Sequence, residues 1–536
     1  MSDIPPDQAA AWEIVDFGTF SEVNRPDESD GYGENLAKTE ENTATEDPPP
    51  GEDITDESLA RFRRDFCKEE SGSVAQNAIA QMSLLDATLS QNVRHQSLDS
   101  YWGIDLDRGS MPATNQKDSG RCWMFGALNL FRFGTMEKLG VDDFEFSESY
   151  LYFWYLLEQC NYCCEYAIRY WEVPLDDRRV SDFLDSPIDD GGDWDIAVNL
   201  LKKYGVVPKN VFPETYSSSN TDELIEVLTT LLRATVRTLR LTLQQGSSVE
   251  QARDIKWKTV GDAYRILAIH LGSPPTEFCW QYRDNEGNFH QMTNITPQAF
   301  ADSFITVPFS QYISLIQDPR HEYYKRYAVL DSMPIAENAP TCFINIPAEE
   351  MKQMCLNMLQ DKLPVWFACN VNEQCDNDDG LWDEHLYRTY ELYGIRDVDP
   401  DPSRHMIYDK AERIRYGTPM GTHVMLMTGA DSSCTDNDDE NDARSVRRWR
   451  VENSWGSYAG DNGYYTMNDN WFAPNVFEVV APPQYLSDKA KMAMGLDPIL
   501  LPPWDPMCSR GKRGRRRRTR ARGGGGGGGG RIRKSR

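Results

Sequence analysis

The chain changes its hydrophobic pattern near its middle, from helical periods to short strands. In the first half, apolar residues recur every three or four positions, which is typical of amphipathic helices packed on a core. Ser147 precedes a long aromatic-rich segment as an N-cap residue, and Gly205 follows another segment as a C-terminal stop. The pattern predicts helices that begin at residues 59–62 and that span 75–88, 125–139, 148–165 and 194–204.

After residue 340, apolar residues come in short runs separated by glycine and asparagine turns. Such runs are typical of buried strands. They predict strands at 363–369, 423–427, 449–453, 464–467 and 476–480. Because the helices precede the strands instead of alternating with them, the sequence predicts an α+β fold with segregated helical and β-rich halves.

Between the halves, residues 222–272 have helix-forming composition and few helix breakers. They predict two long helices, 223–243 and 248–271, which we interpret as an insertion. The predicted organisation is an acidic disordered segment (1–58), a helical half (59–220), a mainly helical insertion (221–345), a β half (346–490), a C-terminal arm (491–507) and a basic, glycine-rich disordered tail (508–536).

Charge is distributed unevenly over the 536 residues. The first sixty hold 17 Asp or Glu against 2 Lys or Arg, whereas residues 509–536 hold 13 Lys or Arg and no acidic residue. The two ends nearly cancel, so the middle carries most of the net charge of −28, which argues against non-specific nucleic-acid binding there. The arginine-rich tail remains a candidate for binding nucleic acid by neutralising phosphates.

The sequence shows neither a membrane-spanning segment nor a typical targeting peptide. It has no run of about eighteen apolar residues, and its first residues resemble neither a signal peptide nor a typical transit peptide. We therefore expect no membrane partner and a cytoplasmic location, with a mitochondrial pool left open. The twelve cysteines are then expected to be mostly reduced thiols.

One cysteine stands out by its position. Polar and glycine residues change at Cys122 to an almost unbroken apolar run. A thiolate is the nucleophilic form of cysteine, and free N–H groups at a helix N-terminus stabilise it. A cysteine at the start of a core helix is more often structural, so a catalytic interpretation needs partners elsewhere in the chain.

Three residues complete a candidate thiol-hydrolase set. Among seven histidines, His423 lies at the start of an apolar strand, while the others lie in charged, helical or loop-like segments. Asn453 ends another predicted strand and can orient an imidazole, with Trp455 placed to cover it from water. Gln116 and the backbone N–H of Cys122 can stabilise an oxyanion. Cys122, His423, Asn453 and Gln116 are the predicted catalytic residues, and no metal or cofactor is expected.

The surrounding motifs resemble those of papain-like cysteine peptidases. Residues 115–123 are similar to the nucleophile motif of that clan, and residues 453–456 to its asparagine motif. His423 follows Cys122 by about 300 residues, roughly twice the papain spacing, so a large insertion separates them. This insertion and many shorter stretches resemble the bleomycin hydrolase / aminopeptidase C family over residues 60–507.

The resemblance implies a papain-like fold with a helical hook insertion, assembled as a ring-shaped homohexamer. It implies an aminopeptidase in which Cys122 attacks the first peptide bond, His423 transfers the proton, Asn453 orients His423 and Gln116 stabilises the oxyanion. The implied substrates are peptides with a free N-terminus, the amide of bleomycin and homocysteine thiolactone. The family's C-terminal arm restricts cleavage to the N-terminal end, because its terminal carboxylate pairs with the substrate amine.

The C-terminus departs from this pattern, since the chain runs 29 residues beyond Met507. A flexible cationic tail cannot place its carboxylate in a cleft as a short arm does. The tail is either trimmed, bound to an acidic partner such as nucleic acid or the chain's own N-terminal segment, or an error of gene prediction. Trimming and a gene-prediction error are together favoured over a binding role.

Alternatives remain open at this point. A nucleic-acid-associated regulator would depend on the tail, and acyl transfer could use the same Cys–His–Asn set. The cysteines at 160, 163 and 164 resemble a zinc half-site, but no second pair follows at zinc spacing, which favours core residues. The acidic run 436–442 lacks the features of a calcium loop and is interpreted as a surface loop.

Overall fold

The computed structural model describes residues 51–68, 70–98, 101–106, 111–395, 409–432 and 446–507. Contacts divide the chain into two units, Met1–Glu69 and Glu70–Arg536. In the first unit, α1 (Asp56–Lys68) is amphipathic, and its apolar residues Leu59, Phe62 and Phe66 are exposed. The helix begins before the predicted start at residue 59, inside the segment predicted to be disordered.

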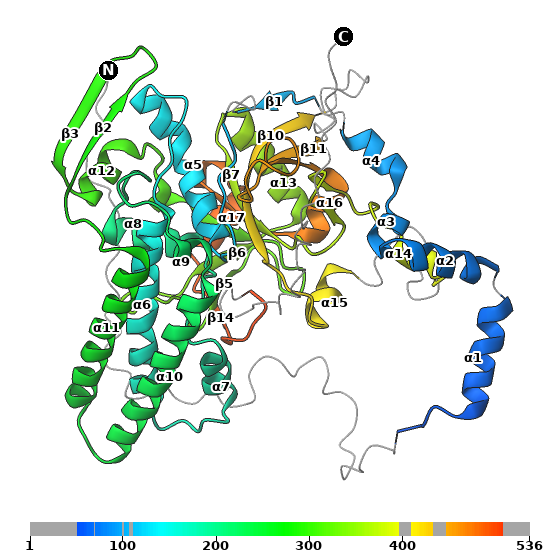
Figure 1. Cartoon of the computed structure of the whole chain (residues 1–536), viewed down its shortest axis with the longest axis horizontal. Helices are drawn as coiled ribbons and strands as arrows, with labels where there is room; N and C mark the ends of the chain where they lie inside the picture. The colour runs from blue at the N-terminus through cyan, green and yellow to red at the C-terminus, as the bar shows by residue number, and fades with distance from the viewer. Residues whose placement is uncertain are drawn as a thin grey trace, which may run out of the picture. The chain divides into compact units, whose positions relative to one another are not determined.

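Helices dominate the first part of the second unit (Figure 1). They are α2 (Glu70–Gln81), α3 (Leu84–Thr88), α4 (Gln91–Leu98), α5 (Cys122–Leu139), α6 (Glu148–Arg169), α7 (Arg178–Asp185), α8 (Trp194–Tyr204), α9 (Tyr216–Ser219), α10 (Asp222–Gln244), α11 (Val249–Leu271) and α12 (Pro297–Phe304). The later ones are η1 (Phe309–Gln311), α13 (Ala348–Gln360), α14 (Thr389–Leu392), α15 (Lys410–Arg415), α16 (Asp469–Asn475), η2 (Pro483–Tyr485) and α17 (Asp488–Met494).

Capping residues set the boundaries of several helices close to their predicted positions. The Ser147 hydroxyl accepts a hydrogen bond from the Tyr150 N–H and starts α6. Gly205, with φ of 68°, ends α8 in a backbone conformation that glycine adopts without strain. The predicted helix 75–88 is instead divided into α2 and α3, because the Ser83 hydroxyl accepts from the Asp86 N–H and begins a new helix.

The strands that the structure describes form one twelve-stranded mixed sheet and one separate hairpin. The sheet order is β14-β5-β6-β4-β13-β7-β10-β11-β12-β9-β8, with β1 paired to β10. Its strands are β1 (Ile104–Asp105), β4 (Ile313–Ile316), β5 (Arg326–Val329), β6 (Cys342–Asn345), β7 (Val365–Cys369), β8 (Cys375–Asp376), β9 (Leu381–Trp382), β10 (His423–Ser432), β11 (Val446–Glu452), β12 (Tyr464–Asn468), β13 (Val476–Ala481) and β14 (Ile499–Leu501). All five predicted strands are confirmed, as β7 and β10 to β13.

The predicted insertion contains both helices and strands. Helices α10 and α11 pair with each other and pack on α6 (Figure 1). The second part of 221–345 also holds strands that the sequence did not predict: the hairpin of β2 (Phe278–Arg283) and β3 (Phe289–Ile295) and the strands β4, β5 and β6. Strands β4 and β5 pair with β13 and β14 from the C-terminal part of the chain, and such distant partners leave no local sequence signal.

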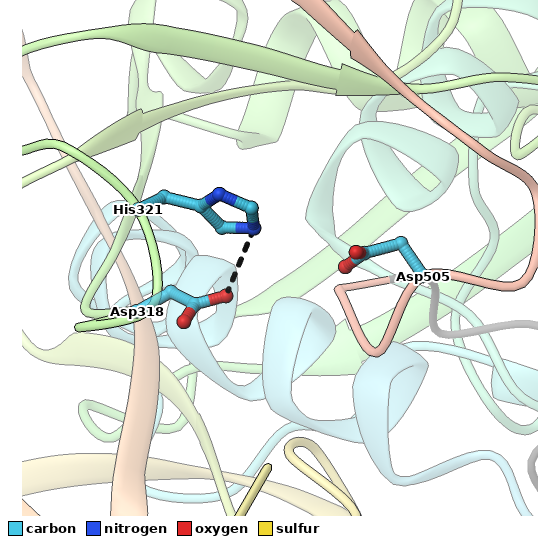
Figure 2. A group of neighbouring side chains, drawn as sticks. All are labelled: Asp318, His321 and Asp505. Atoms are coloured by element: carbon cyan, nitrogen blue, oxygen red, sulfur yellow. Dashed lines mark ion pairs between the residues drawn. The ribbon is translucent and has the colours of Figure 1, made fainter. Parts of the chain in front are cut away.

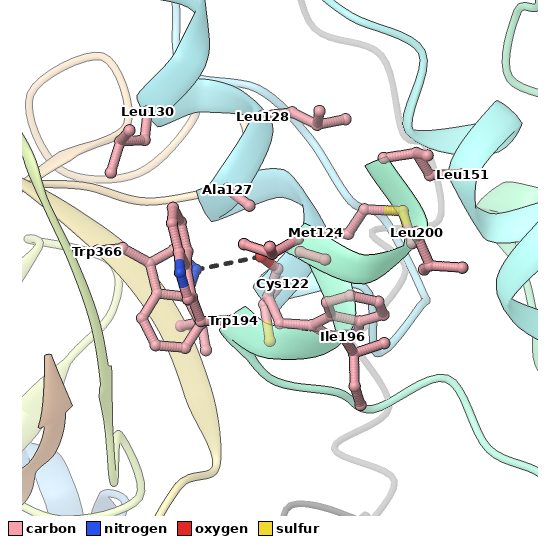
Figure 3. Packing of buried hydrophobic residues seen from close by; sticks show 14 of the residues in the cluster. Cys122, Met124, Ala127, Leu128, Leu130, Leu151, Trp194, Ile196, Leu200 and Trp366 are labelled. Carbon is pink, nitrogen blue, oxygen red and sulfur yellow. Dashed lines mark hydrogen bonds between the residues drawn. The ribbon is translucent and has the colours of Figure 1, made fainter. Parts of the chain in front are cut away.

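Close packing places the start of α5 against the sheet. A Cβ atom at Gly126 would lie 3.0 Å from the Val424 side chain and 3.1 Å from the Trp366 ring, so a larger residue would require these neighbours to shift. The Trp366 indole N–H donates to the Trp123 carbonyl at 3.2 Å. This contact joins β7 to the first turn of α5 beside Cys122 (Figure 3).

The structure tests the prediction for the three cysteines on α6 but not the predictions for the acidic run and the basic tail. Cys160, Cys163 and Cys164 are fully buried on α6, which confirms them as core residues. The acidic run 436–442 and the basic tail 508–536 lie outside the described residues. Within the described part of the chain, no helix has both the length and the apolar character to cross a membrane.

Candidate active site

Cys122 opens helix α5, with Arg121 as the N-cap residue. Its thiol is buried among core side chains (Figure 3). The pKa of Cys122 is raised to about 11, mainly by this burial. Hydrogen bonds from the backbone N–H groups of Val424 and Trp123 act to lower the pKa, and the nearby Asp190 carboxylate acts to raise it. The thiol is therefore protonated at neutral pH, and formation of the reactive thiolate requires an acceptor for its proton.

His423 directly precedes the Val424 N–H that faces this thiol. Its Nε2 atom lies 2.7 Å from Oδ1 of Asn453, which also accepts the Ser454 N–H at 2.7 Å. Because an amide oxygen only accepts hydrogen bonds, Nε2 carries the hydrogen of the neutral ring. The other ring nitrogen, Nδ1, is then the one that can accept a proton.

Neighbouring strands bring His423 and Asn453 together. Strands β10 and β11 pair antiparallel with Leu426 opposite Glu452, so both residues fall at the same end of the two strands. Trp455 stacks on the His423 ring, with centroids 4.6 Å apart and the planes inclined by 27°. The indole therefore covers one face of an imidazole that is itself buried.

Gln116 is held at both ends of its side chain. Its Oε1 atom accepts the Ser454 hydroxyl at 2.6 Å, and its Nε2 atom donates to the Ser119 carbonyl at 2.6 Å. The backbone N–H of Gln116 also donates to the Ser454 carbonyl at 2.8 Å. Since an amide nitrogen carries two hydrogens, the second N–H of Gln116 is available to another acceptor.

Ser454 is thus the link that sequence reasoning missed. It bonds Gln116 through its hydroxyl and Asn453 through its N–H, so one hydrogen-bonded chain connects the predicted oxyanion donor to the predicted base. The adjacency of Ser454 to Asn453 was visible in the sequence, but its contact with Gln116, 338 residues away, was not. The structure brings the four predicted residues to one place, the start of α5 facing the start of β10.

Comparison with known proteins identifies the family of the chain. Residues 53–508 match the sequence profile of the Peptidase C1-like family. The chain belongs to this family. Aminopeptidase G of Lactobacillus delbrueckii subsp. lactis is 34% identical over 456 residues, which cover 84% of this chain and 99% of that protein. The bleomycin hydrolase of Gallus gallus is 33% identical over 465 residues, covering 86% and 99%.

A solved structure is similar over the same extent of this Peptidase C1-like chain. The crystal structure of PepW from Lactobacillus rhamnosis covers 85% of this chain and 98% of its own, with a TM-score of 0.79 and 33% identity. The predicted resemblance and the predicted α+β, papain-like fold are therefore confirmed. The chain is a cysteine-type peptidase.

One cluster among the described residues of this Peptidase C1-like chain has side chains that suit a metal ion: Asp318, His321 and Asp505 (Figure 2). The Arg320 guanidinium donates to Asp318 Oδ2 at 2.6 Å and to Asp505 Oδ1 at 3.0 Å. A cation thus already pairs with both carboxylates. We interpret the cluster as an ion-pair anchor for the C-terminal segment that contains Asp505.

Proposed function

We propose that this chain is a cysteine aminopeptidase of the bleomycin hydrolase type. The observation that carries the proposal is the 2.7 Å contact between His423 Nε2 and Asn453 Oδ1, which leaves Nδ1 as the ring atom that can accept a proton. His423 directly precedes Val424, whose N–H faces the Cys122 thiol at the start of α5. Relatives that match nearly their whole length are named aminopeptidase or bleomycin hydrolase, which supports the same activity.

In the proposed reaction, Nδ1 of His423 takes the proton of the Cys122 thiol. The resulting thiolate is stabilised by the imidazolium and by the Val424 N–H, which offset the burial that raises the thiol pKa. The thiolate attacks the carbonyl carbon of the first peptide bond, and His423 then donates its proton to the leaving amine. His423 next activates a water that hydrolyses the thioester, which regenerates the thiol.

The oxyanion formed in each step needs hydrogen-bond donors. We assign these to the second N–H of Gln116 and to the backbone N–H of Cys122, which is free of the helix ladder because Cys122 is the first residue of α5. Asn453 keeps the imidazole in the tautomer that can accept the thiol proton.

The proposed substrates are peptides with a free N-terminus. Related amides and thiolactones fit the same chemistry, because each presents an acyl carbon that can form a thioester with Cys122. A thiolactone releases a thiol that ionises more easily than an amine, so its acylation depends less on proton donation by His423.

We also propose a homohexameric assembly. The support is a set of exposed apolar side chains on the hairpin of α10 and α11: Val227, Leu241, Trp257, Tyr264 and Ile269, of which Ile269 is 73% and Trp257 is 60% exposed. Such side chains mark protein–protein contacts when they gather on one element. Light scattering tests the assembly, since a hexamer has six times the 61.3 kDa mass of the chain and a monomer would contradict it.

The activity is tested with Cys122→Ala. Hydrolysis of an aminoacyl fluorogenic amide should fall by at least about 1,000-fold, because no other group replaces the nucleophile. The matched control is Cys160→Ala, which removes a fully buried thiol from α6 and should leave the rate per folded molecule unchanged. An N-acetylated substrate should be a poor one for the wild type, and retention of activity in Cys122→Ala would overturn the proposal.

A further inference from the structure

A segment distant in sequence lies along the loop that precedes the nucleophile. We call residues 214–221, which contain α9, the clamp segment, and residues 118–121 the nucleophile loop. The Asp118 N–H donates to the Ser219 carbonyl at 3.0 Å, and the Thr221 N–H donates to the Asp118 carbonyl at 3.3 Å. The two backbones are therefore bonded in both directions, like two short parallel strands.

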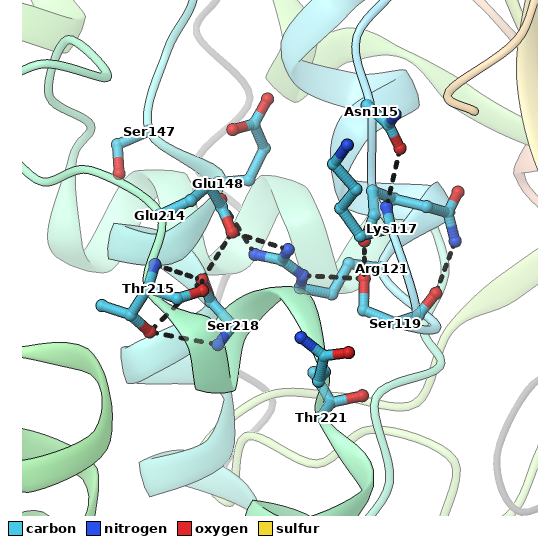
Figure 4. Close-up of polar contacts among 12 residues, drawn as sticks. Asn115, Lys117, Ser119, Arg121, Ser147, Glu148, Glu214, Thr215, Ser218 and Thr221 are labelled. Atoms are coloured by element: carbon cyan, nitrogen blue, oxygen red, sulfur yellow. Dashed lines mark hydrogen bonds and ion pairs between the residues drawn. The ribbon is translucent and has the colours of Figure 1, made fainter. Parts of the chain in front are cut away.

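A buried ion pair strengthens this attachment. The Arg121 side chain is fully buried, and its Nη1 and Nη2 atoms donate to the two carboxylate oxygens of Glu214 at 3.1 and 2.8 Å (Figure 4). The rings of Phe125 and Tyr152 each lie 5.2 Å from the guanidinium carbon. The Ser218 hydroxyl donates to Glu214 at 2.5 Å. Such a two-pronged pair fixes both the position and the plane of the guanidinium.

Arg121 is connected through Ser119 to Gln116, the proposed oxyanion donor. Its Nε atom donates to the Ser119 hydroxyl at 3.0 Å, and that hydroxyl donates to the Gln116 carbonyl at 2.6 Å (Figure 4). The Ser119 carbonyl in turn accepts the Gln116 side-chain N–H at 2.6 Å. One hydrogen of the Gln116 amide is thus fixed by a residue that Arg121 fixes, which sets the direction of the other hydrogen.

A second carboxylate holds the middle of the nucleophile loop. Oδ2 of Asp190 accepts the Gly120 N–H and the Thr221 hydroxyl, both at 2.5 Å. A Cβ atom at Gly120 would lie 2.5 Å from Oδ1 of Asp190, so glycine is needed for this approach. Each residue from 118 to 121 is therefore fixed from outside the loop: Asp118 and Arg121 by the clamp segment, Gly120 by Asp190 and Ser119 by Gln116.

We propose that Arg121 and Glu214 are positioning residues for the oxyanion hole, acting through Ser119 on the Gln116 amide and through the backbone on the Cys122 N–H. The inference rests on the proposed function, because an oxyanion forms only if Cys122 attacks a carbonyl. A buried ion pair gives little stability over apolar residues of similar volume. The contribution of this pair is geometric: it fixes the donors before substrate binds, and neither residue touches the substrate.

Glu214→Gln tests the inference, because it keeps the shape of the side chain and leaves the Arg121 charge unpaired. Two reactions of Cys122 separate positioning from stability. Alkylation by iodoacetamide, followed by mass spectrometry of the peptide that contains Cys122, forms no oxyanion, whereas amide hydrolysis does. The kcat per alkylatable Cys122 should fall about 10- to 100-fold with KM changed less than about threefold, as expected for weakened oxyanion donors. The alkylation rate constant should stay within about threefold of wild type.

The ion pair of Lys256 and Glu165 supplies a matched control. Its atoms lie 2.6 Å apart between α11 and α6, and Glu165 is as exposed as Glu214, at 20%. Glu165→Gln should lower the melting temperature without changing kcat per alkylatable Cys122. Ser218→Ala provides a milder variant should Glu214→Gln not fold, because it removes one donor to Glu214 and no charge, and it should lower kcat about threefold.

The outcomes separate the two proposals. If Glu214→Gln and Ser218→Ala keep the wild-type kcat per alkylatable Cys122, or if hydrolysis and alkylation decline by the same factor, the ion pair is only structural and the inference is wrong. If Cys122→Ala still hydrolyses the aminoacyl amide, the proposed function itself fails. A selective loss of hydrolysis in Glu214→Gln, with normal alkylation, supports both.

Discussion

The two sides of the candidate active site are fixed by different kinds of interaction. On the cysteine side, full charges hold the nucleophile loop, through the buried pair of Arg121 and Glu214 and the carboxylate of Asp190. On the histidine side, neutral groups hold the imidazole, through the amide of Asn453 and the indole of Trp455. Ser454 is neutral and joins the two sides through Gln116.

The difference follows from what each side must do. The proposed thiolate is an anion, and a fixed cation one residue before Cys122, itself neutralised by Glu214, adds little net charge near the sulfur. In the proposed reaction, the imidazole gains a proton and then loses it. A neutral partner such as Asn453 orients the ring without binding the charged form so strongly that the proton is retained. Charged groups thus fix the nucleophile loop, whereas neutral hydrogen bonds orient His423, the residue that transfers a proton in the proposed reaction.

The largest effect is expected on the histidine side, from Asn453→Ala. Loss of the Oδ1 acceptor releases the ring from its tautomer and orientation, so kcat should fall at least roughly 100-fold, the lower end of what general acid–base catalysis contributes. Steady-state kinetics on an aminoacyl amide measure this. Asn453→Asp is the matched control, because it keeps the acceptor but adds a charge beside His423.

Asn453→Asp also sharpens the comparison. Its carboxylate favours the imidazolium, so the pKa of His423 should rise and the acid limb of the pH–rate profile should move to higher pH. If Asn453→Ala matched the wild type in kcat, or if the profile of Asn453→Asp did not move, the neutral contact would not be what orients the base.

A smaller effect is expected at the junction of the two sides, from Ser454→Ala. This substitution removes the hydroxyl that bonds Gln116 Oε1 at 2.6 Å and keeps the Ser454 N–H bond to Asn453. The Gln116 amide should lose one of its two anchors, and kcat should fall about tenfold at unchanged alkylation of Cys122. Ser454→Thr, which retains the hydroxyl, should have a kcat between those of Ser454→Ala and the wild type. Equal kcat values for all three proteins would show that the Ser454 hydroxyl does not contribute to catalysis.

The histidine side of the candidate site was more predictable from the sequence than the cysteine side. His423 begins an apolar strand, Asn453 directly follows one, and helix caps such as Ser147 have strong local signals. These elements were therefore predicted, and the four candidate residues could be proposed from them. Among the strands in residues 278–345 that were missed, β4 and β5 are short and pair with β13 and β14, far along the chain, whereas β2 and β3 pair with each other across a short turn.

The charged side was not predictable for a related reason. Arg121 stands within the stretch that pointed to the nucleophile, but nothing in its spacing indicates Glu214, 93 residues later. Buried ion pairs have no periodicity, and their partners are set by how loops pack. The distance of Asp190 from Gly120, 70 residues along the chain, illustrates the same point.

The smallest expected effect concerns the pH dependence of stability on the charged side. Glu148 is buried beside Lys209 and Glu214, and burial raises its pKa to about 7, although Lys209 acts in the opposite direction. The folded protein therefore holds a proton here that the unfolded chain releases above its ordinary pKa of 4.5. Because the folded state binds more protons, the free energy of unfolding should decrease as pH rises from about 4.5 to 7.

Glu148→Gln should remove this part of the pH dependence. The expected contribution to the free energy of unfolding is about 1 kcal/mol. It is smaller than the whole pKa shift of Glu148 would give, because the charge of Lys209 stabilises the carboxylate as it ionises. Urea unfolding between pH 5 and 8 measures it, with Glu137→Gln, an exposed position on α5, as control. If the free energies of unfolding of wild type and Glu148→Gln decrease in parallel over this range, Glu148 is ionised throughout. The prediction that burial keeps Glu148 protonated would then be wrong.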